Sequence, residues 1–180
     1  MKFSIVTTNF NGERYLRQCM ESVLSQRGSG VELEYMVIDG GSRDKSAEII
    51  KSYGSDIAYF VSEKDNGPAN AINKGLRKAT GGIIGWINAD DYYQPGALAR
   101  AAEAMTLARE AALCFGHCPI VDENGAEIRR GITRFKEAFF PWSCRFTIQC
   151  INYVSQPATF FRRSAMEKAG FLREDFKAAW

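Results

Sequence analysis

Polar and acidic side chains gather where the apolar segments in the first half of this sequence end. They are Thr7 and Asn9 after the first segment, Asp39 after the second, Asp65 after the third, and Asp90 and Asp91 after the fourth. Adjacent carboxylates repel each other unless a cation or hydrogen-bond donors compensate their charge. Hard oxygen ligands suit Mg2+ or Mn2+, which also bind phosphate oxygens. The pattern therefore indicates a site for a divalent metal and a nucleotide, whereas the plain alternative for Asp90-Asp91 is the start of a helix.

The elements that must position these side chains alternate along the chain. Apolar segments predict strands over residues 3–8, 33–38, 57–62 and 83–88, and the patterns between them predict helices between Gly12 and Gly28, from 42 or 44 to 53, and over 68–80 and 95–109. This order predicts a parallel sheet covered by helices on both faces. Ligands of such sheets bind at the carboxyl ends of the strands, where the acidic groups stand.

Beyond residue 111 the pattern changes to shorter elements. It predicts strands over 112–115, 119–122, 127–132 and 158–162, a turn at 123–125 and a helix from 164. Four aromatic residues in this part fit either a stacking surface for an acceptor or an ordinary core: Phe139, Phe140, Trp142 and Phe146. We expect a single domain over residues 1–180, built from two halves.

Each candidate residue also has a purely structural interpretation. Asp39 fits a turn cap, Asn9 fits a turn, and Thr7 fits an ordinary β-branched strand position. Asp65-Asn66-Gly67 fits a tight turn with a positive φ at its glycine. Asn73 lies inside a predicted helix, where asparagine is a poor former, and this favours a specific side-chain hydrogen bond.

Taken together, four stretches of the sequence resemble the family 2 glycosyltransferases. They are Ser-Ile-Val-Thr-Thr-Asn-Phe-Asn-Gly (4–12), Met-Val-Ile-Asp-Gly-Gly-Ser-Arg-Asp (36–44), Ser-Glu-Lys-Asp-Asn-Gly-Pro-Ala-Asn-Ala-Ile-Asn-Lys-Gly (62–75) and Gly-Trp-Ile-Asn-Ala-Asp-Asp (85–91). Gln156 to Arg163 and Gly170-Phe171 are also similar to the family. The resemblance implies the GT-A fold, an α/β, Rossmann-like and mostly parallel sheet flanked by helices, with a small mixed second half. Residues 1–110 would be the nucleotide-sugar-binding half, and residues 111–180 a partial acceptor-side half.

The resemblance also implies a role for each candidate residue. Thr7 and Asp39 would contact the base, usually uracil; Asn9 would lie beside the nucleotide; Asp90 would lie near the ribose and phosphates; Asp91 would ligate the metal, Mn2+ or Mg2+; and Asp65, Gly67 and Asn73 would line the donor pocket. The implied reaction moves a sugar from a UDP-sugar to a hydroxyl of a saccharide or lipid-linked acceptor, with inversion, in the synthesis of cell-surface polysaccharide or glycolipid. A divalent ion would stabilise the charge on the leaving diphosphate, and a carboxylate base would take the acceptor proton.

The position of that base departs from the family pattern. The family carries its base in an acidic stretch shortly after the motif that Gly170-Phe171 matches, and here only Glu174 and Asp175 follow as acids. Either one of them is the base, or both are solvated loop acids and the base lies beyond Trp180, which implies a truncated chain. Asn70 also departs from the pattern, because aspartate is common there, and the change removes a charge from the donor region.

Two other functions compete with this prediction. One is a non-catalytic nucleotide-sugar-binding domain. The other is a sugar nucleotidyltransferase, which usually has a glycine-rich loop with a basic residue after the first strand. The segment from Asn9 to Arg14 holds a single glycine, so the nucleotidyltransferase is disfavoured.

Composition and charge exclude further classes of function. The 180 residues are 46% hydrophobic with a net charge of +2, so no nucleic-acid partner is expected. One histidine and five cysteines without a CxxC pair disfavour a structural zinc site and suit reduced thiols in a cytoplasmic protein. The sequence shows no signal peptide or membrane span. We expect a cytoplasmic protein, with peripheral association at the inner face of the membrane through missing regions as an open alternative.

Overall fold

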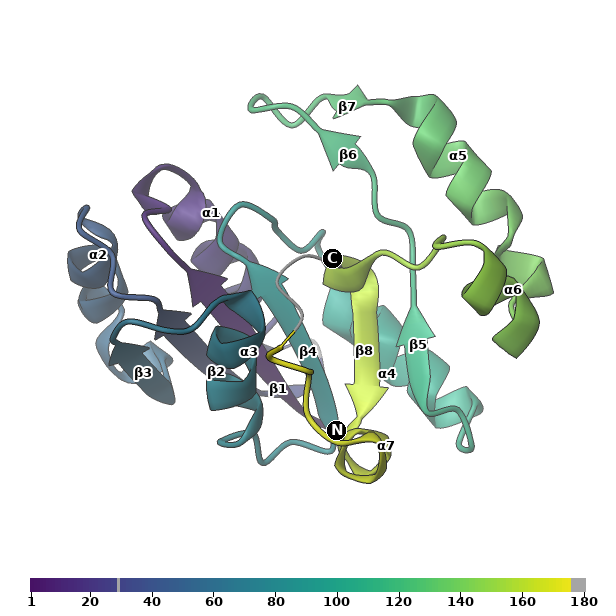
Figure 1. Cartoon of the computed structure of the whole chain (residues 1–180), viewed down its shortest axis with the longest axis horizontal. Helices are drawn as coiled ribbons and strands as arrows, with labels where there is room; N and C mark the ends of the chain where they lie inside the picture. The colour runs from purple at the N-terminus through teal and green to yellow at the C-terminus, as the bar shows by residue number, and fades with distance from the viewer. Residues whose placement is uncertain (29, 176–180) are drawn as a thin grey trace. The chain divides into compact units, whose positions relative to one another are not determined.

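The computed structural model describes residues 1–28 and 30–175, which alternate between strands and helices as expected (Figure 1). The elements in chain order, with short 3-10 turns written η, are β1 (Lys2–Asn9), α1 (Glu13–Leu24), β2 (Glu32–Asp39), α2 (Ser46–Ser52), η1 (Gly54–Asp56), β3 (Tyr59–Ser62), α3 (Pro68–Leu76), β4 (Ile83–Asn88), α4 (Ala97–Leu107), β5 (Leu113–Phe115), β6 (Ile120–Val121), β7 (Glu127–Ile128), α5 (Arg130–Ala138), η2 (Phe140–Trp142), α6 (Arg145–Cys150), η3 (Gln156–Ala158), β8 (Thr159–Arg162) and α7 (Arg163–Ala169). None of the helices in these residues has the length and apolar character that crossing a bilayer requires.

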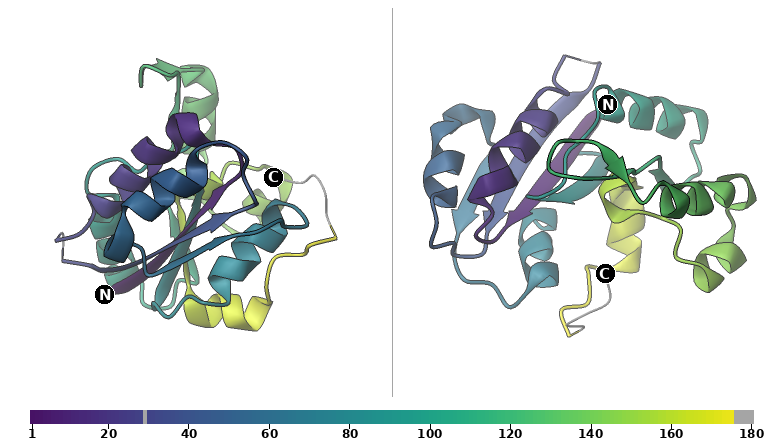
Figure 2. Two further views of the ribbon diagram at one scale, coloured as in Figure 1. Left: turned by 90° about the vertical axis from the view of Figure 1, so that its left-hand side faces the viewer. Right: turned by 90° about the horizontal axis from the view of Figure 1, so that it is seen from above.

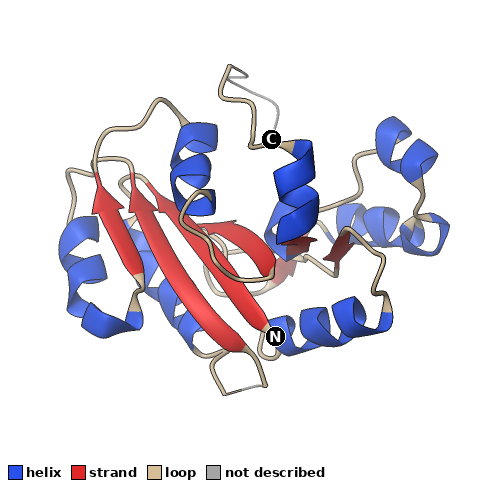
Figure 3. Ribbon diagram, turned by 90° about the horizontal axis from the view of Figure 1, so that it is seen from below, coloured by secondary structure: helices blue, strands red, loops and turns tan. Residues whose placement is uncertain are grey.

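The main sheet has the strand order β3-β2-β1-β4-β8-β5. The first four strands pair in parallel, and β8 pairs antiparallel to β4. Figure 3 shows the long parallel strands with helices packed on both faces of the sheet. This confirms the predicted α/β architecture with its mostly parallel sheet. Because parallel strands share one direction, the carboxyl ends of β1, β2, β3 and β4 meet at one edge.

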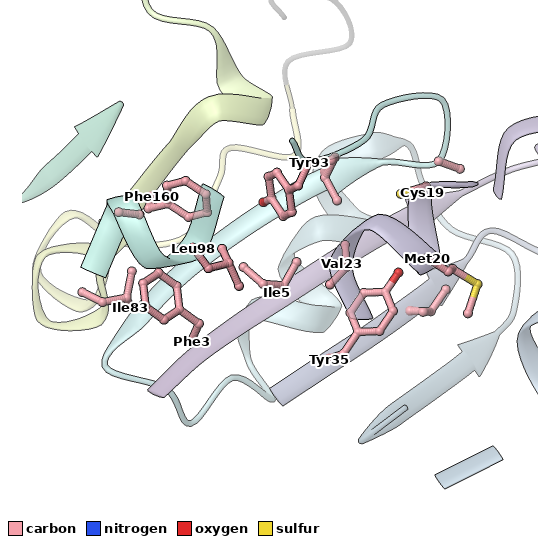
Figure 4. Close-up of a cluster of buried hydrophobic side chains, with 14 of the residues drawn as sticks. Phe3, Ile5, Cys19, Met20, Val23, Tyr35, Ile83, Tyr93, Leu98 and Phe160 are labelled. Carbon is pink, nitrogen blue, oxygen red and sulfur yellow. The ribbon is translucent and has the colours of Figure 1, made fainter. Parts of the chain in front are cut away.

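Two apolar clusters, one on each face, hold the helices against the sheet. The first cluster contains side chains of α1, α2 and α4 together with Phe3, Ile5 and Tyr35 of the sheet, and Figure 4 shows its central residues. The second cluster lies beneath α3 and contains Val6, Met36 and Trp86, with residues of α7 packed against it. Figure 2 gives two further views of this layered arrangement. Since side chains alternate between the faces of a strand, β1 serves both clusters.

Two predicted element boundaries are corrected. The helix predicted over 68–80 ends at Leu76, because the backbone amides of Lys78 and Ala79 turn to carbonyls three residues back and tighten the last turn. The strand predicted over 127–132 is wrong beyond Ile128. Arg129 adopts a left-handed conformation with φ 53°, and α5 begins directly after it. Neither α5 nor α6 was predicted.

The chain divides into two compact units. Unit 1 comprises residues 1–114 and 160–180, of which residues 176–180 lie outside the description, and unit 2 comprises residues 115–159. The two ends of unit 2 lie close together, since the Gly116 amide donates to the Ala158 carbonyl at 3.0 Å. The prediction that residues 1–180 form a single domain stays a prediction.

An aromatic cluster forms the interior of unit 2. Phe115 contacts Phe140 and Tyr153, and Phe139 stacks on Tyr153, which is buried. Two of the four aromatic residues singled out above, Phe139 and Phe140, are half-buried and pack within this cluster. The other two, Trp142 and Phe146, are 73% exposed.

A carboxylate at the opposite edge of the sheet ties three elements of unit 1 together. Glu34 of β2 accepts hydrogen bonds from the hydroxyl of Ser4 on β1 and from the amide and hydroxyl of Thr80 after α3, the latter two at 2.8 and 2.5 Å. Lys2 lies 3.4 Å away. Burial alone would raise the pKa of Glu34, but the bonds from Ser4 and Thr80 outweigh it and lower that pKa from 4.5 to about 2.

Replacing Glu34 by glutamine is expected to lower the free energy of unfolding at neutral pH by about 1–2 kcal/mol. The side chain is only 14% exposed, so solvent screens the lost interactions little. Because the folded-state pKa is depressed, the stabilisation is present above pH 4.5 and disappears as the pH falls toward 2. Urea denaturation of both chains at pH 7 and pH 3 measures this. Glu32→Gln is the control, since Glu32 is 70% exposed, and an equal effect of both substitutions would contradict the assignment.

Candidate nucleotide-binding edge of the sheet

The carboxyl ends of the four parallel strands lie level with one another. In the strand register Asn9 stands opposite Asp39, Asp39 opposite Ser62, and Thr8 opposite Asn88. Since neighbouring strands are about 5 Å apart, the ends of β2 and β4 are separated by about 10 Å with β1 between them. The structure therefore brings Asn9, Asp39 and the segment after Asn88 to one edge, as the sequence predicts.

Asp39 is the centre of a hydrogen-bond network that joins three strand ends. Its Oδ1 accepts from Asn9 Nδ2 at 2.7 Å and from Ser42 Oγ at 2.5 Å. Its Oδ2 accepts from the Ser42 amide at 3.0 Å and from Ser62 Oγ at 2.6 Å. A carboxylate has about four acceptor positions, so these bonds use its full capacity. A base or ribose that bound Asp39 would have to replace one of these partners.

This network also fixes the ionisation of Asp39. Burial would raise the pKa of the carboxyl, but the hydrogen bonds from Ser42, Ser62 and Asn9 outweigh it and hold the pKa below its ordinary value of 3.8. The residue is completely buried. Asp39 is therefore a fixed negative charge surrounded by donors, and it can orient a neighbouring ligand without moving.

Ser42 and Ser62 were not singled out as site residues from the sequence, although both bind Asp39. The sequence allowed either Ser42 or Asp44 at the start of the helix. Ser42 binds Asp39 instead, and Asp44 accepts from the amides of Ser46 and Glu13 at 3.0 Å each. The signal for Ser62 was present, because it is the last residue of a predicted strand. A polar residue at that end of a parallel strand faces the same edge as its neighbours.

Thr7 lies on the same face of β1 as Asn9 but is turned into the core. It is fully buried, and its hydroxyl lies 2.8 Å from the hydroxyl of Tyr35 and 3.8 Å from Sγ of Cys19. Figure 4 shows Tyr35 and Cys19 in this cluster. A contact between Thr7 and a nucleotide stays a prediction.

Asp90 and Asp91 form a turn directly after β4. The Asp91 amide donates to the Asn88 carbonyl at 3.1 Å, and Asp90 is exposed. Burial, followed by repulsion from Asp90, raises the pKa of Asp91 from 3.8 to about 6. The same two carboxylates add to the burial that raises the pKa of the Cys19 thiol to about 12. Burial and the neighbouring Asp90 therefore outweigh the backbone hydrogen bond that stabilises the Asp91 carboxylate.

The adjacent carboxylates of Asp90 and Asp91 fit a hard divalent cation. Mg2+ and Mn2+ are often bound through one or two carboxylates, with waters and substrate phosphates as the remaining ligands. No group of three or more His, Cys, Asp or Glu side chains suited to a metal occurs in residues 1–28 and 30–175. The donor set at Asp90 and Asp91 thus suits an ion that is bound together with a diphosphate rather than one held by protein ligands alone.

The Asp65–Gly67 turn lies against the loop that follows β2. Asp65 Oδ1 accepts from the Gly67 amide at 2.9 Å, and Gly67 has φ 117° just before α3. Gly40 permits this approach, because a Cβ at that position would lie 2.6 Å from Asp65 Oδ2. The structure therefore brings Asp65 and Gly67 next to the Asp39 loop, as a shared donor pocket requires.

Asn73 is engaged by the C-terminal segment instead of standing free at the edge. It is 1% exposed, and its amide exchanges hydrogen bonds with the backbone of Leu172 and donates to Glu174. The expected specific side-chain hydrogen bond is present, while its role in a donor pocket stays a prediction. Asp175 pairs with Arg173. A role of Glu174 or Asp175 as the catalytic base stays a prediction.

A mostly parallel α/β sheet with amide and carboxylate groups at its carboxyl edge belongs to the class of open α/β sheets that bind ligands at that edge. Residues 4–170 match the model of glycosyl transferase family 2, and the chain therefore belongs to that family. This confirms the family resemblance.

Relatives and solved structures agree with this membership. An uncharacterized glycosyltransferase of Mycobacterium tuberculosis is 31% identical over 179 residues, covering 98% of this chain and 64% of the relative. One from Nostoc sp. is 30% identical, covering 74% of this chain and 42% of the relative. The chain thus spans less than two thirds of the length of these curated relatives.

Solved structures show the same fold at low sequence identity. The crystal structure of S. aureus TarS 1-349 superimposes with a TM-score of 0.75 at 21% identity, over 99% of this chain and 52% of that one. The same protein has a structure in complex with UDP-GlcNAc, with a TM-score of 0.72 over 94% of this chain and 47% of that one at 21% identity. The mannosyltransferase PcManGT from Pyrobaculum calidifontis, in complex with GDP-Man and Mn2+, has a TM-score of 0.66 at 18% identity, over 96% of this chain and 48% of that one. The likeness confirms the GT-A fold.

Proposed function

We propose that the protein transfers a sugar from a nucleoside-diphosphate donor, a UDP-sugar, to a hydroxyl of a saccharide or lipid-linked acceptor. Family membership supports a glycosyltransferase. The observation that carries the donor proposal is the edge where Asp39 lies in a saturated network and where burial and Asp90 disfavour the charge of Asp91. TarS complexes with UDP and UDP-GlcNAc, in the same fold, support a uridine donor.

Each residue of the edge has a proposed part in donor binding. Asn9 and Asp39 face the nucleoside, and the Asp65–Gly67 turn borders the sugar. Asp91 would hold a divalent ion, Mg2+ or Mn2+, and Asp90 would lie near the ribose and phosphates. The Mn2+ bound by the mannosyltransferase of this fold supports that choice. When bound, such an ion stabilises the negative charge that develops on the leaving diphosphate.

Several finer features of the reaction belong to the same proposal. We infer inversion at the anomeric carbon, a role in cell-surface polysaccharide or glycolipid synthesis, and action in the cytoplasm at the inner face of the membrane. An acceptor hydroxyl that attacks the sugar must lose its proton, so a carboxylate base is required on the acceptor side. Residues 111–180 are the proposed acceptor-side half of the domain.

Titration calorimetry of the chain with UDP-GlcNAc tests the proposal. We expect saturable binding with Mn2+ that weakens at least about tenfold when a chelator removes the ion, because the diphosphate loses its bridging cation. GDP-mannose serves as the comparison nucleotide sugar. Binding that is indifferent to both the ion and the base would contradict the proposed donor site, and binding without turnover would favour the non-catalytic alternative.

A further inference from the structure

We propose that Asn70 and Asn73 of α3 are positioning residues that hold the segment Phe171–Glu174 and couple it to the Asp65–Gly67 turn. We call Asn70, Asn73 and Arg77, together with Leu172 and Glu174, the α3 clamp. All of its members belong to unit 1. The coupling to donor binding rests on the function proposed above, whereas the clamp itself does not.

Asn73 recognises the backbone of the segment in both directions. Its Nδ2 donates to the Leu172 carbonyl at 2.8 Å, and its Oδ1 accepts from the Leu172 amide at 3.0 Å. Such a reciprocal pair imitates the pairing of two strands and fixes one residue in place. Asn73 is 1% exposed, so these bonds are made away from competing water. The Leu172 side chain adds apolar contact with the cluster beneath α3.

Glu174 completes the clamp through three donors, two on α3 and one, Arg77, at the C-terminal cap of the helix. Its Oε1 accepts from Asn73 Nδ2 at 2.7 Å, its Oε2 accepts from Asn70 Nδ2 at 2.8 Å, and Arg77 lies 3.4 Å away. Arg77 also lies over the Phe171 ring, 5.0 Å from its centre. Residues 70, 73 and 77 are three and four apart, which places them on one face of α3. That face is therefore shaped to receive the segment.

Asn70 links this segment to the donor edge. Its Nδ2 donates to Glu174, while its Oδ1 accepts from the Asn66 amide at 3.3 Å. Asn66 stands in the turn that Asp65 and Gly67 close through their own hydrogen bond. The side-chain amide of Asn70 thus accepts a hydrogen bond from the turn with its oxygen and donates one to the segment with its nitrogen. Only a side chain that both donates and accepts can do this, and a carboxylate there would face the carboxylate of Glu174.

A reciprocal exchange of amide and carboxylate tests the clamp. Asn70→Asp opposes two carboxylates. Glu174→Gln keeps one acceptor oxygen and so leaves the amide of either Asn70 or Asn73 facing another amide donor. Each single substitution is expected to speed hydrogen exchange at the Leu172 and Asn66 amides about tenfold. The double substitution restores one donor and one acceptor, and exchange is expected to return to within about threefold of the original chain. For UDP-GlcNAc with Mn2+, the Kd is expected to rise about fivefold in each single variant and to recover in the double.

Asn124→Asp is the matched control, because it makes the same chemical change in an exposed turn outside unit 1. It is expected to change neither the two exchange rates nor the Kd. Asn70→Ala, which removes both bonds without adding charge, tests the clamp again if Asn70→Asp does not fold. Unchanged exchange at Leu172 in the single variants would overturn the clamp, and unchanged exchange at Asn66 would overturn the coupling. A chain that binds no donor refutes the proposed function, while the exchange rates still decide this inference.

Discussion

Asp91→Asn is expected to make the chain more stable while it raises the Kd for UDP-GlcNAc with Mn2+ by about a hundredfold or more. The loss of binding follows from the removal of the proposed metal ligand. The gain follows from the raised pKa of Asp91, which shows that the folded chain holds this charge at a cost. Removing the charge is expected to raise the free energy of unfolding at pH 7 by about 1–2 kcal/mol.

The pH dependence of this gain has a definite sign. The pKa of Asp91 is about 6 in the folded chain against an ordinary 3.8, so the folded state binds the proton more tightly than the unfolded state. The stability of the original chain should therefore rise as the pH falls from about 6 to 3.8. The advantage of Asp91→Asn should shrink across the same window.

Denaturation of both chains from pH 4 to pH 8 without metal measures this prediction, and calorimetry with UDP-GlcNAc and Mn2+ measures the binding. Glu103→Gln on α4 is the control, since it removes an exposed acid far from the edge in sequence. It is expected to leave both quantities unchanged. A variant that is destabilised at pH 7 would contradict the idea that the folded chain disfavours the charge of Asp91.

Asp39→Asn is expected to have the opposite effect on stability, with a loss of about 2–3 kcal/mol in the free energy of unfolding at neutral pH. The carboxylate accepts four hydrogen bonds in a completely buried position. An asparagine keeps only one of the two oxygens and has an amide group, itself a donor, in place of the other. If that group replaces Oδ2, the Ser42 amide and the Ser62 hydroxyl lose their acceptor. Donor binding should fail together with stability, because the ends of β1, β2 and β3 lose their common partner.

The pKa of Asp39 lies below 3.8, so its contribution is present above that pH and is lost as the pH falls through the folded-state value. The difference between the original chain and Asp39→Asn should accordingly shrink below pH 3.8. Urea denaturation at several pH values measures it. Ser62→Ala removes only one of the four bonds and is expected to cost about 1 kcal/mol. An Asp39→Asn chain as stable as the original would refute the idea of a saturated network.

The edge of the sheet was predictable because it follows from local information. Strand ends are visible as changes from apolar to polar residues, and parallel pairing brings them together whatever the loops do. The partners of Asn73 were not predictable in this way, since Leu172 and Glu174 are 99 and 101 residues distant in sequence. Position 73 only showed that asparagine is an unfavourable choice inside a helix.

The elements of unit 2 were harder to predict from the sequence for a different reason. The strand predicted to reach residue 132 gives way to α5 at a left-handed Arg129, a conformation for which arginine carries no sequence signal. Thr7 illustrates a third limit. The alternation of side chains places it on the same face as Asn9, but only the tertiary packing shows that Tyr35 already occupies its hydroxyl.

The insertion of β8 between β4 and β5 has a consequence for the order of events during synthesis. Phe160 completes the first apolar cluster and Phe161 stacks on Trp86, so unit 1 lacks a full interior until the ribosome has passed residue 162. Contacts between residues so distant along the chain slow folding. The two ends of residues 115–159 meet at Gly116 and Ala158. This segment can therefore become longer or shorter during evolution while the sheet edge that bears Asp39 and Asp91 stays intact.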